Sequence, residues 1–173
     1  MKPYVLFTTA LLLLQVASCK KETDPPPLQA ASLVAGRAAI RFNTDRNFNG
    51  QTYFEVVNSA DTKTTFDTLG TSVRNIGLQT TEMKEGVPTR KVIISIAVRI
   101  PVSGSTAIDL SRTSGLPMAR IRLESYSLLG IIRQSASGTL TITRLTDTMV
   151  EGTFTATTDD NLNISKGSFA GRL

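Results

Sequence analysis

The feature that most constrains the fold of this chain is an alternation of apolar and polar side chains with a period of two residues. It is clearest at 91–100, where valine or isoleucine occupies every second position. Successive side chains of a β-strand point to opposite faces, so this pattern predicts a strand with one apolar face. Residues 118–126 alternate in the same way and carry arginines on the polar face. Both stretches are typical of an antiparallel sheet with one buried and one solvent-exposed face.

Other strands are predicted between short turn sequences. The segment 28–35 fits either a short helical turn or a linker, and no long amphipathic helix pattern follows the N-terminal apolar run. Glycine and proline cluster where the turns are expected. The further predicted strands are 37–43 and 52–57, on either side of a polar turn, and 72–81, which directs Ile76 and Leu78 to the core; further turns are expected at 86–88 and 115–117.

The end of the chain contains a weak internal repeat. Gly138-Thr139-Leu140-Thr141 recurs as Gly152-Thr153-Phe154-Thr155 and again as Gly167-Ser168-Phe169-Ala170, at spacings of 14 and 15 residues. One strand and one turn take about this length, so the repeat predicts a three-strand meander. With the other strands, it predicts an all-β fold, either an antiparallel β-sandwich or a small β-barrel of roughly 8–10 strands. The core residues expected in the meander are Leu140, Ile142, Phe154 and Phe169.

The N-terminus has the anatomy of a signal peptide. Lys2 supplies a positive charge, and an apolar run at 5–14 follows it. This run is much shorter than the roughly 20 residues that a membrane-spanning helix needs. Val16-Ala17-Ser18-Cys19 resembles the lipobox of bacterial lipoproteins, which implies that Cys19 is lipidated and becomes the mature N-terminus. Ordinary secretion with cleavage in the same region and an uncleaved anchor are the alternatives.

Three segments are therefore expected: a cleaved signal peptide at 1–18, a lipidated N-terminus with a Pro-rich tether at 19–35, and an all-β domain at 36–173. Proline-rich, charged sequence cannot bury apolar surface, so the tether is expected to be extended and to lift the domain off the bilayer. Lys20 stands where aspartate is linked to inner-membrane retention, which favours the outer membrane. Whether the domain faces the periplasm or the cell surface stays open.

A family resemblance is carried by residues 137–173. Their Gly-Thr-Leu-Thr-Ile-Thr, Gly-Thr-Phe and Gly-Ser-Phe runs are similar to the end of small uncharacterised lipoproteins of Bacteroidetes-type bacteria. The resemblance covers the leader and the C-terminal strands, and it implies a compact, lipid-anchored β-domain. Because the motif consists of turn glycines and core phenylalanines, it implies no catalytic residue.

Composition excludes several kinds of chemistry. The chain has no histidine, no tryptophan and one cysteine. A Ser-His-Asp or Cys-His catalytic site, a histidine-based zinc site and an internal disulfide are therefore excluded. The formal net charge is +5, but the arginines are scattered and not interleaved with aromatic residues, which argues against nucleic-acid binding. We expect no enzymatic activity.

The only candidate cofactor is calcium. Asp45, Asn47 and Asn49, followed by glycine, place oxygen ligands at alternate positions, as at the start of a calcium-binding loop. Glu55 lies one residue short of the position of the closing carboxylate. An Asn- and Gly-rich hairpin loop is the alternative interpretation, and a second oxygen cluster at 159–163 is open to the same two interpretations.

Two surface features complete the candidate sites. Segment 127–132 is apolar on both faces of an extended chain, which indicates either contact with a partner or lipid, or a buried strand extension or loop. Two Asp-Thr-apolar triplets, both in expected loops, resemble the O-glycosylation sites of exported Bacteroidetes-type proteins. The residues are Leu128, Leu129, Ile131 and Ile132 for apolar contact, and Thr68 and Thr148 for glycosylation.

The leading hypothesis is a lipid-anchored outer-membrane protein whose β-domain binds without catalysis or supports the envelope. Its acyl chains would hold it to the membrane, and its partner would be an envelope protein, a glycan or an apolar ligand. One alternative is a lipocalin-like carrier of a small apolar ligand, which needs an enclosed cavity. Another is a hydrolase with two facing carboxylates, but no spacing singles out a pair among Asp109, Glu124 and Glu151.

Overall fold

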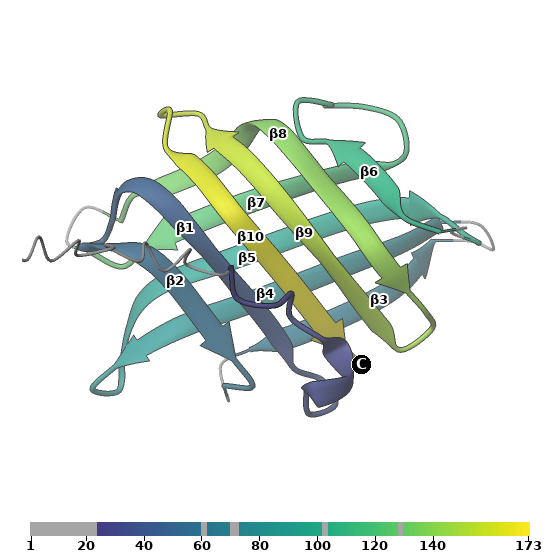
Figure 1. Cartoon of the computed structure of the whole chain (residues 1–173), viewed down its shortest axis with the longest axis horizontal. Coiled ribbons are helices and arrows are strands. Elements are labelled where there is room, and N and C mark those ends of the chain that lie inside the picture. Colours follow the sequence, from purple (N-terminus) through teal and green to yellow (C-terminus); the bar gives the residue numbers. More distant parts are fainter. Residues whose placement is uncertain (1–23, 60–61, 70–72, 102–103, 128–129) are drawn as a thin grey trace, which may run out of the picture.

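The computed structural model describes residues 24–59, 62–69, 73–101, 104–127 and 130–173 of the chain. These residues form one short 3₁₀ helix and ten strands (Figure 1). Among the described residues there is no helix whose length and hydropathy suit a membrane span. The elements are η1 (Ala30–Ser32), β1 (Ala38–Phe48), β2 (Gln51–Val57), β3 (Lys63–Leu69), β4 (Val73–Lys84), β5 (Val87–Arg99), β6 (Thr106–Asp109), β7 (Met118–Ser125), β8 (Ile132–Leu145), β9 (Met149–Thr158) and β10 (Asn163–Arg172).

The strands form one antiparallel sheet that curls into two facing layers. Their order is β2-β1-β10-β9-β8-β7-β5-β4-β3, and β6 pairs with β8. In Figure 1 the front layer (β2, β1, β10, β9 and β8) crosses over the back layer (β7, β5, β4 and β3). Strand β8 joins the layers, because its first residues pair with β7 and the rest with β9. The sheet is a half-barrel, which confirms the predicted antiparallel all-β fold and the C-terminal meander.

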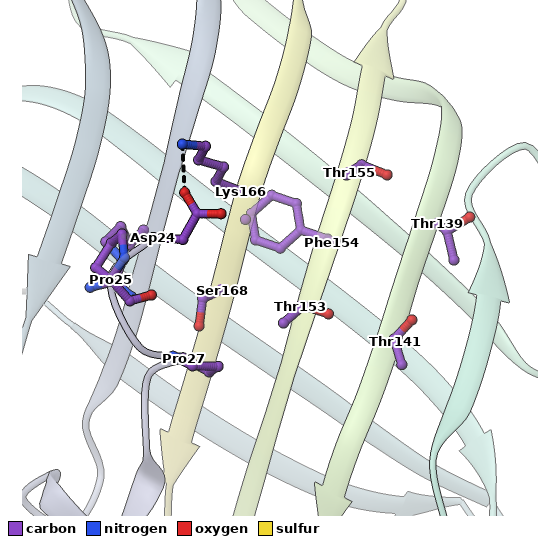
Figure 2. A pocket seen from close by; sticks show the side chains of 12 residues that line it. Asp24, Pro25, Pro27, Thr139, Thr141, Thr153, Phe154, Thr155, Lys166 and Ser168 are labelled. Atoms are coloured by element: carbon purple, nitrogen blue, oxygen red, sulfur yellow. Dashed lines mark hydrogen bonds and ion pairs between the residues drawn. The ribbon is translucent and has the colours of Figure 1, made fainter. Parts of the chain in front are cut away.

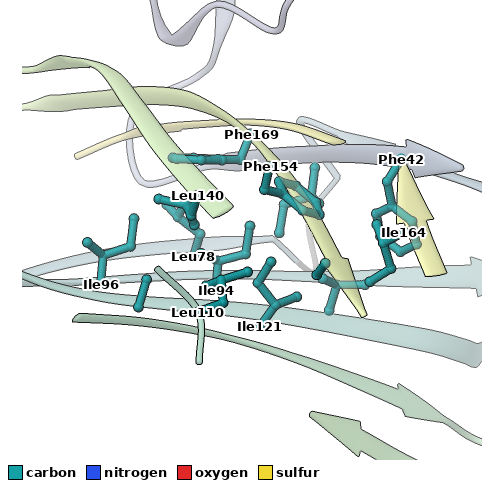
Figure 3. Close-up of a cluster of buried hydrophobic side chains, with 14 of the residues drawn as sticks. Phe42, Leu78, Ile94, Ile96, Leu110, Ile121, Leu140, Phe154, Ile164 and Phe169 are labelled. Carbon is teal, nitrogen blue, oxygen red and sulfur yellow. The ribbon is translucent and has the colours of Figure 1, made fainter. Parts of the chain in front are cut away.

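The hydrophobic core lies between the two layers (Figure 3). The four core residues predicted in the meander are each at most 3% exposed, and the alternating residues of β5 and β7 face them from the back layer. Phe42 stacks on Phe54 with ring centroids 5.1 Å apart, and it meets the edge of Phe154 at 6.0 Å. Each fully buried side chain of this size contributes about 1.5–3 kcal/mol, so this layer of side chains dominates the stability.

Two hairpin turns are tighter than the sequence pattern indicates. Asn49 and Gly50 alone connect β1 to β2, with φ of 53° and 88°, and Glu85 and Gly86 alone connect β4 to β5. Positive φ at both central residues is the geometry of the two-residue turn that matches the twist of antiparallel strands. Strand β1 therefore continues to Phe48, and the polar turn predicted after residue 43 is shorter than expected.

The segment before β1 packs on the outer surface of the front layer; we call residues 24–37 the strap. It includes η1, so a short helical turn is the one of the two alternatives for 28–35 that the structure contains. Ala30 and Leu33 are buried in a small second cluster with Ala39 of β1 and Ala170 of β10. An extended, unpacked tether was expected here; instead, its described part, residues 24–35, lies against the sheet.

Candidate functional site

One candidate binding surface is a hollow of about 390 Å³ on the outer face of the back layer. Its floor consists of backbone and small side chains on the central strands β4 and β5, and larger side chains on β3 and β7 form its walls. We call this hollow the outer trough. The outward-facing residues that line it are Thr65, Asp67, Asn75, Gly77, Ser95, Ala97, Met118 and Arg120.

The strand register builds the outer trough from two rows of outward-facing residues. In one row, Gly77 and Ser95 pair with each other and lie between Thr65 and Arg120. In the neighbouring row, Asn75 and Ala97 lie between Asp67 and Met118 on the same four strands. Directly paired side chains on one face are close neighbours, so small residues in the middle of both rows leave a depression.

Gly77 keeps one side of this depression open. A Cβ on Gly77 would lie 2.6 Å from the Thr65 hydroxyl, which donates a hydrogen bond to the Gly77 carbonyl at 3.3 Å. Glycine inside a strand often marks a close approach of this kind. A side chain at this position would displace Thr65 from the wall of the outer trough.

Two opposite charges stand at opposite walls of the outer trough. Asp67 on β3 and Arg120 on β7 are both exposed, and among the described residues neither has a hydrogen-bond or ion-pair partner. Many other charges on the domain are paired, as in Arg74 with Asp147 at 2.9 Å. The strands lie about 4.8 Å apart, so three strand steps and the shift of one row place the Cα atoms of Asp67 and Arg120 about 16 Å apart.

A second hollow, of about 340 Å³, lies on the outer face of the front layer beside the strap (Figure 2). Threonines of β8 and β9 line one side of it, and Asp24, Pro25 and Pro27 of the strap line the other. Because part of the wall belongs to the strap, this hollow depends on the docking of the N-terminal segment.

The largest buried polar group is Arg90 of β5, which sequence reasoning missed. Its side chain is 2% exposed and forms an ion pair with Glu82 of β4. It also donates hydrogen bonds to the Tyr53 carbonyl and the Gln51 side chain, both at 2.8 Å. Arg90 thus ties the β4–β5 hairpin to the β1–β2 hairpin and closes one end of the half-barrel. The one indication in the sequence that Arg90 is buried was its position on the apolar face of a strand in which apolar and polar residues alternate.

Two of the three residues of the predicted calcium site, Asp45 and Asn49, are engaged in hydrogen bonds within the protein. Asp45 lies in β1, and its two carboxylate oxygens accept hydrogen bonds from the backbone and side chain of Asn163 at 3.0 and 2.7 Å. The backbone bond is the main cause that lowers the pKa of Asp45. Asn49 is in the hairpin turn and donates to the Thr89 carbonyl, and Asn47 is exposed. No group of three or more histidine, cysteine, aspartate or glutamate side chains that could hold a metal ion occurs in the described part of the chain.

The second oxygen cluster also makes structural bonds. Asp160 accepts a hydrogen bond from Thr158 at 2.6 Å and forms an ion pair with Arg133 at 2.7 Å. Burial raises the pKa of Asp160, but these bonds more than compensate and lower it. Asp159 accepts a bond from the backbone of Gln134. The cluster therefore fixes the β9–β10 turn against the start of β8.

The carboxylates considered for hydrolysis each have a hydrogen-bond or ion-pair partner. Asp109 accepts bonds from Ser111, which lower its pKa. Glu124 pairs with Arg122 at 2.9 Å, and Glu151 accepts a bond from the backbone of Ala30 at 2.7 Å. Where a carboxyl pKa departs from its ordinary value in the described residues, it is lowered, whereas a general acid needs a raised pKa.

The remaining predicted site residues lie in different parts of the structure, and some lie outside the described residues. Ile131 and Ile132 are 39% and 50% exposed at the β7–β8 connection, so they do not form a buried strand extension. Thr148 is exposed in the β8–β9 turn, as expected. Thr68 is not in a loop, because 63–69 pairs with β4 along its whole length and forms an edge strand. Cys19, Leu128 and Leu129 lie outside the described residues.

No protein-family model, curated protein or solved structure matches this chain. Its function is therefore inferred from the residues and surfaces described above.

Proposed function

We propose that this protein is a lipid-anchored lipoprotein of the bacterial outer membrane whose β-domain binds a partner without catalysis. The anchor is Cys19, at the end of a lipobox-like sequence. The binding surface is the outer trough, and the observation that carries this assignment is that Asp67 and Arg120, on its two walls, have no partner among the described residues. Exposed charges without partners remain available to a ligand.

The charges indicate the chemistry of the partner. A ligand that reaches across the outer trough would place a cationic group near Asp67 and an anionic group near Arg120, two residues whose Cα atoms lie about 16 Å apart. Between them, Ala97 and Met118 offer an apolar surface. An extended segment of an envelope protein carries all three features, whereas a neutral glycan lacks the charges and an apolar ligand would leave both charges without partners.

The two alternative functions have less support. A lipocalin-like carrier needs an enclosed cavity, but the space between the layers is filled by the core residues, and both hollows described above lie on outer faces. A carboxylate-dependent hydrolase needs an acid with a raised pKa facing a second carboxylate, and the candidate carboxylates are hydrogen-bonded or ion-paired to other groups.

The anchor is tested by cell fractionation. Wild-type protein is expected in the outer-membrane fraction, and Cys19→Ala is expected in the soluble fraction, because removal of the thiol removes the attachment point of the acyl chains. Ser18→Ala, which keeps the thiol and a small residue before it, is the matched control. Unchanged membrane retention of Cys19→Ala would contradict lipid anchoring.

The outer trough is tested by photo-crosslinking in intact cells. A photoreactive amino acid at Ser95, on the floor of the outer trough, is expected to yield a protease-sensitive adduct that the same probe at Thr155, on the front layer, does not yield. Charge reversal by Asp67→Lys or Arg120→Glu is expected to weaken the adduct. An adduct that both reversals leave unchanged, or no adduct above the Thr155 control, would refute binding at this surface.

A further inference from the structure

The strap is held to the front layer from Asp24 to Leu33. At its start, the Asp24 carboxylate forms an ion pair with Lys166 of β10 at 2.6 Å (Figure 2). Arg41 of β1 donates hydrogen bonds to two carbonyls of the proline run. The backbone N–H of Leu28 donates to Ser168 of β10 at 2.8 Å. The first residues of the strap are therefore fixed over β1 and β10.

The second half of the strap is fixed more firmly. Ala30 is fully buried, and its N–H donates to Glu151 of β9. Leu33 is 3% exposed, and its carbonyl accepts a hydrogen bond from Arg172 at 3.0 Å. Apolar burial and charge-assisted hydrogen bonds each favour the docked state over a free chain. The strap is thus part of the folded domain, and it does not act as a spacer.

Docking of the strap leaves very little chain between the domain and the predicted anchor. Five residue steps separate Cys19 from Asp24. A fully extended chain spans at most about 3.6 Å per residue, so the lipidated residue lies within about 18 Å of Asp24. A tether that ended at residue 35 would reach roughly 60 Å by the same rule. The difference decides how freely the domain can turn on the membrane.

About 18 Å does not suffice to turn the back layer toward the bilayer. From Asp24, above β10, the chain would have to pass β1 and β2, which takes about 10 Å at 4.8 Å per strand. It would then have to cross two packed layers, about 10 Å apart at their backbones and about 20 Å thick with side chains. The required path of roughly 30 Å exceeds the available length.

We propose that the strap fixes the orientation of the domain on the membrane: the outer face of β1, β8, β9 and β10 lies against the phospholipid headgroups, and the outer trough points away from them. The proposal rests on the lipid anchor at Cys19. It gives the strap a role beyond packing, because the docked strap makes the binding surface face outward. The covalent anchor keeps the front layer at high effective concentration near the bilayer, so only weak headgroup contacts are needed.

The test compares two fluorescent probes in the anchored protein. The full chain is expressed with a fluorescent amino acid at Thr155, on the outer face of β9, or at Ser95, in the outer trough; both positions are exposed. The processed protein is reconstituted into phosphatidylethanolamine–phosphatidylglycerol vesicles that contain a headgroup spin-labelled lipid. Quenching is expected to be several-fold stronger at Thr155 than at Ser95. Equal quenching, or stronger quenching at Ser95, would overturn the proposal.

A longer spacer is the matched control. A flexible Gly-Ser insert of about 12 residues between Thr23 and Asp24 adds up to about 40 Å of reach without altering the strap contacts. It is expected to bring the two probes toward equal quenching. If the insert leaves a strong preference for Thr155, the strap does not set the orientation.

The experiments distinguish a failure of the proposed lipid anchor from a failure of the proposed orientation. If the purified chain carries no lipid, it is not recovered with the vesicles and lacks the added mass of the acyl chains. This result refutes the proposed lipid-anchored function but does not bear on the orientation. The chain without its leader is then coupled through Cys19, its only thiol, to a maleimide-bearing lipid. The same probe comparison then confirms or overturns the orientation.

Discussion

Replacement of Arg90 by methionine removes the ion pair that closes one end of the half-barrel. Methionine keeps an unbranched apolar side chain against the aromatic rings but has no guanidinium. The guanidinium donates to both oxygens of Glu82 and lies 5.4 and 5.1 Å from the ring centres of Phe48 and Phe54. The variant therefore loses an ion pair, cation–π contacts and the hydrogen bonds that hold the β1–β2 hairpin.

The expected loss of stability is about 4 kcal/mol. Breaking a buried ion pair by removing one partner costs about 3–5 kcal/mol, because the other charge is left uncompensated. The side chain of Glu82 is 26% exposed, so water screens it and the lower end, about 3 kcal/mol, applies. Loss of the cation–π contacts adds about 1 kcal/mol. At roughly 2–4 °C per kcal/mol for a domain of this size, the Tm falls by about 8–16 °C.

The same pair predicts a pH dependence. The hydrogen bond from Arg90 is the main cause that lowers the pKa of Glu82 below its ordinary 4.5. A carboxyl whose pKa is lower in the folded state stabilises the fold above its ordinary pKa. The stability that Glu82 contributes is lost as the pH falls from about 4.5 to below the lowered pKa of the folded state. The difference in Tm between wild type and Glu82→Gln should therefore narrow in acid.

Thermal unfolding followed by circular dichroism is the assay for these variants. Arg90→Lys keeps the charge but not the paired hydrogen bonds, so it should fall between wild type and Arg90→Met. The double variant Arg90→Met with Glu82→Gln should lose less stability than the sum of the single variants, because no unpaired charge remains. A fall in Tm of less than about 2 °C for Arg90→Met would refute the assignment of Arg90 as the closing contact.

Three further predictions concern single positions. Thr80 is fully buried, and its hydroxyl has no hydrogen-bond partner in the described part of the chain, so Thr80→Val should raise the free energy of unfolding by about 1 kcal/mol in urea titration. A Cβ on Gly152 would collide with the Phe169 ring, so Gly152→Ala should lower the free energy of unfolding by about 3 kcal/mol or give insoluble protein; a change below about 1 kcal/mol would contradict the close packing. Asp45→Ala removes the acceptor of both Asn163 bonds and should lower the Tm equally with and without calcium; a rise in the Tm of the wild type alone in millimolar calcium would restore the metal-site interpretation.

The local pattern predicted the strands and the core well, because alternation determines which face of a strand is buried. The strand at 91–100, the C-terminal meander and its core residues all follow from side chains within one strand or its turn. Turn length was harder to predict. Asn-Gly and Glu-Gly each complete a turn with two residues, so the neighbouring strands extend further than their apolar residues indicate.

The candidate site could not be predicted, because it exists only in the register of four strands. Gly77, Ser95 and Ala97 are unremarkable small residues in the sequence, and they form the floor of the outer trough only when β4 and β5 pair. The strap was missed for a similar reason. Its partners Glu151 and Lys166 are far from it along the chain, whereas its proline-rich composition is typical of a free tether.

The orientation of the domain and the availability of the outer trough both depend on a lipid at Cys19. The most direct measurement is mass spectrometry of the N-terminal peptide from protein purified out of the membrane fraction. The peptide is expected to begin at Cys19 and to carry the added mass of a diacylglyceryl group, with or without an amide-linked acyl chain. An unmodified peptide that begins at Met1, or a mature N-terminus after Cys19, would contradict the lipid anchor.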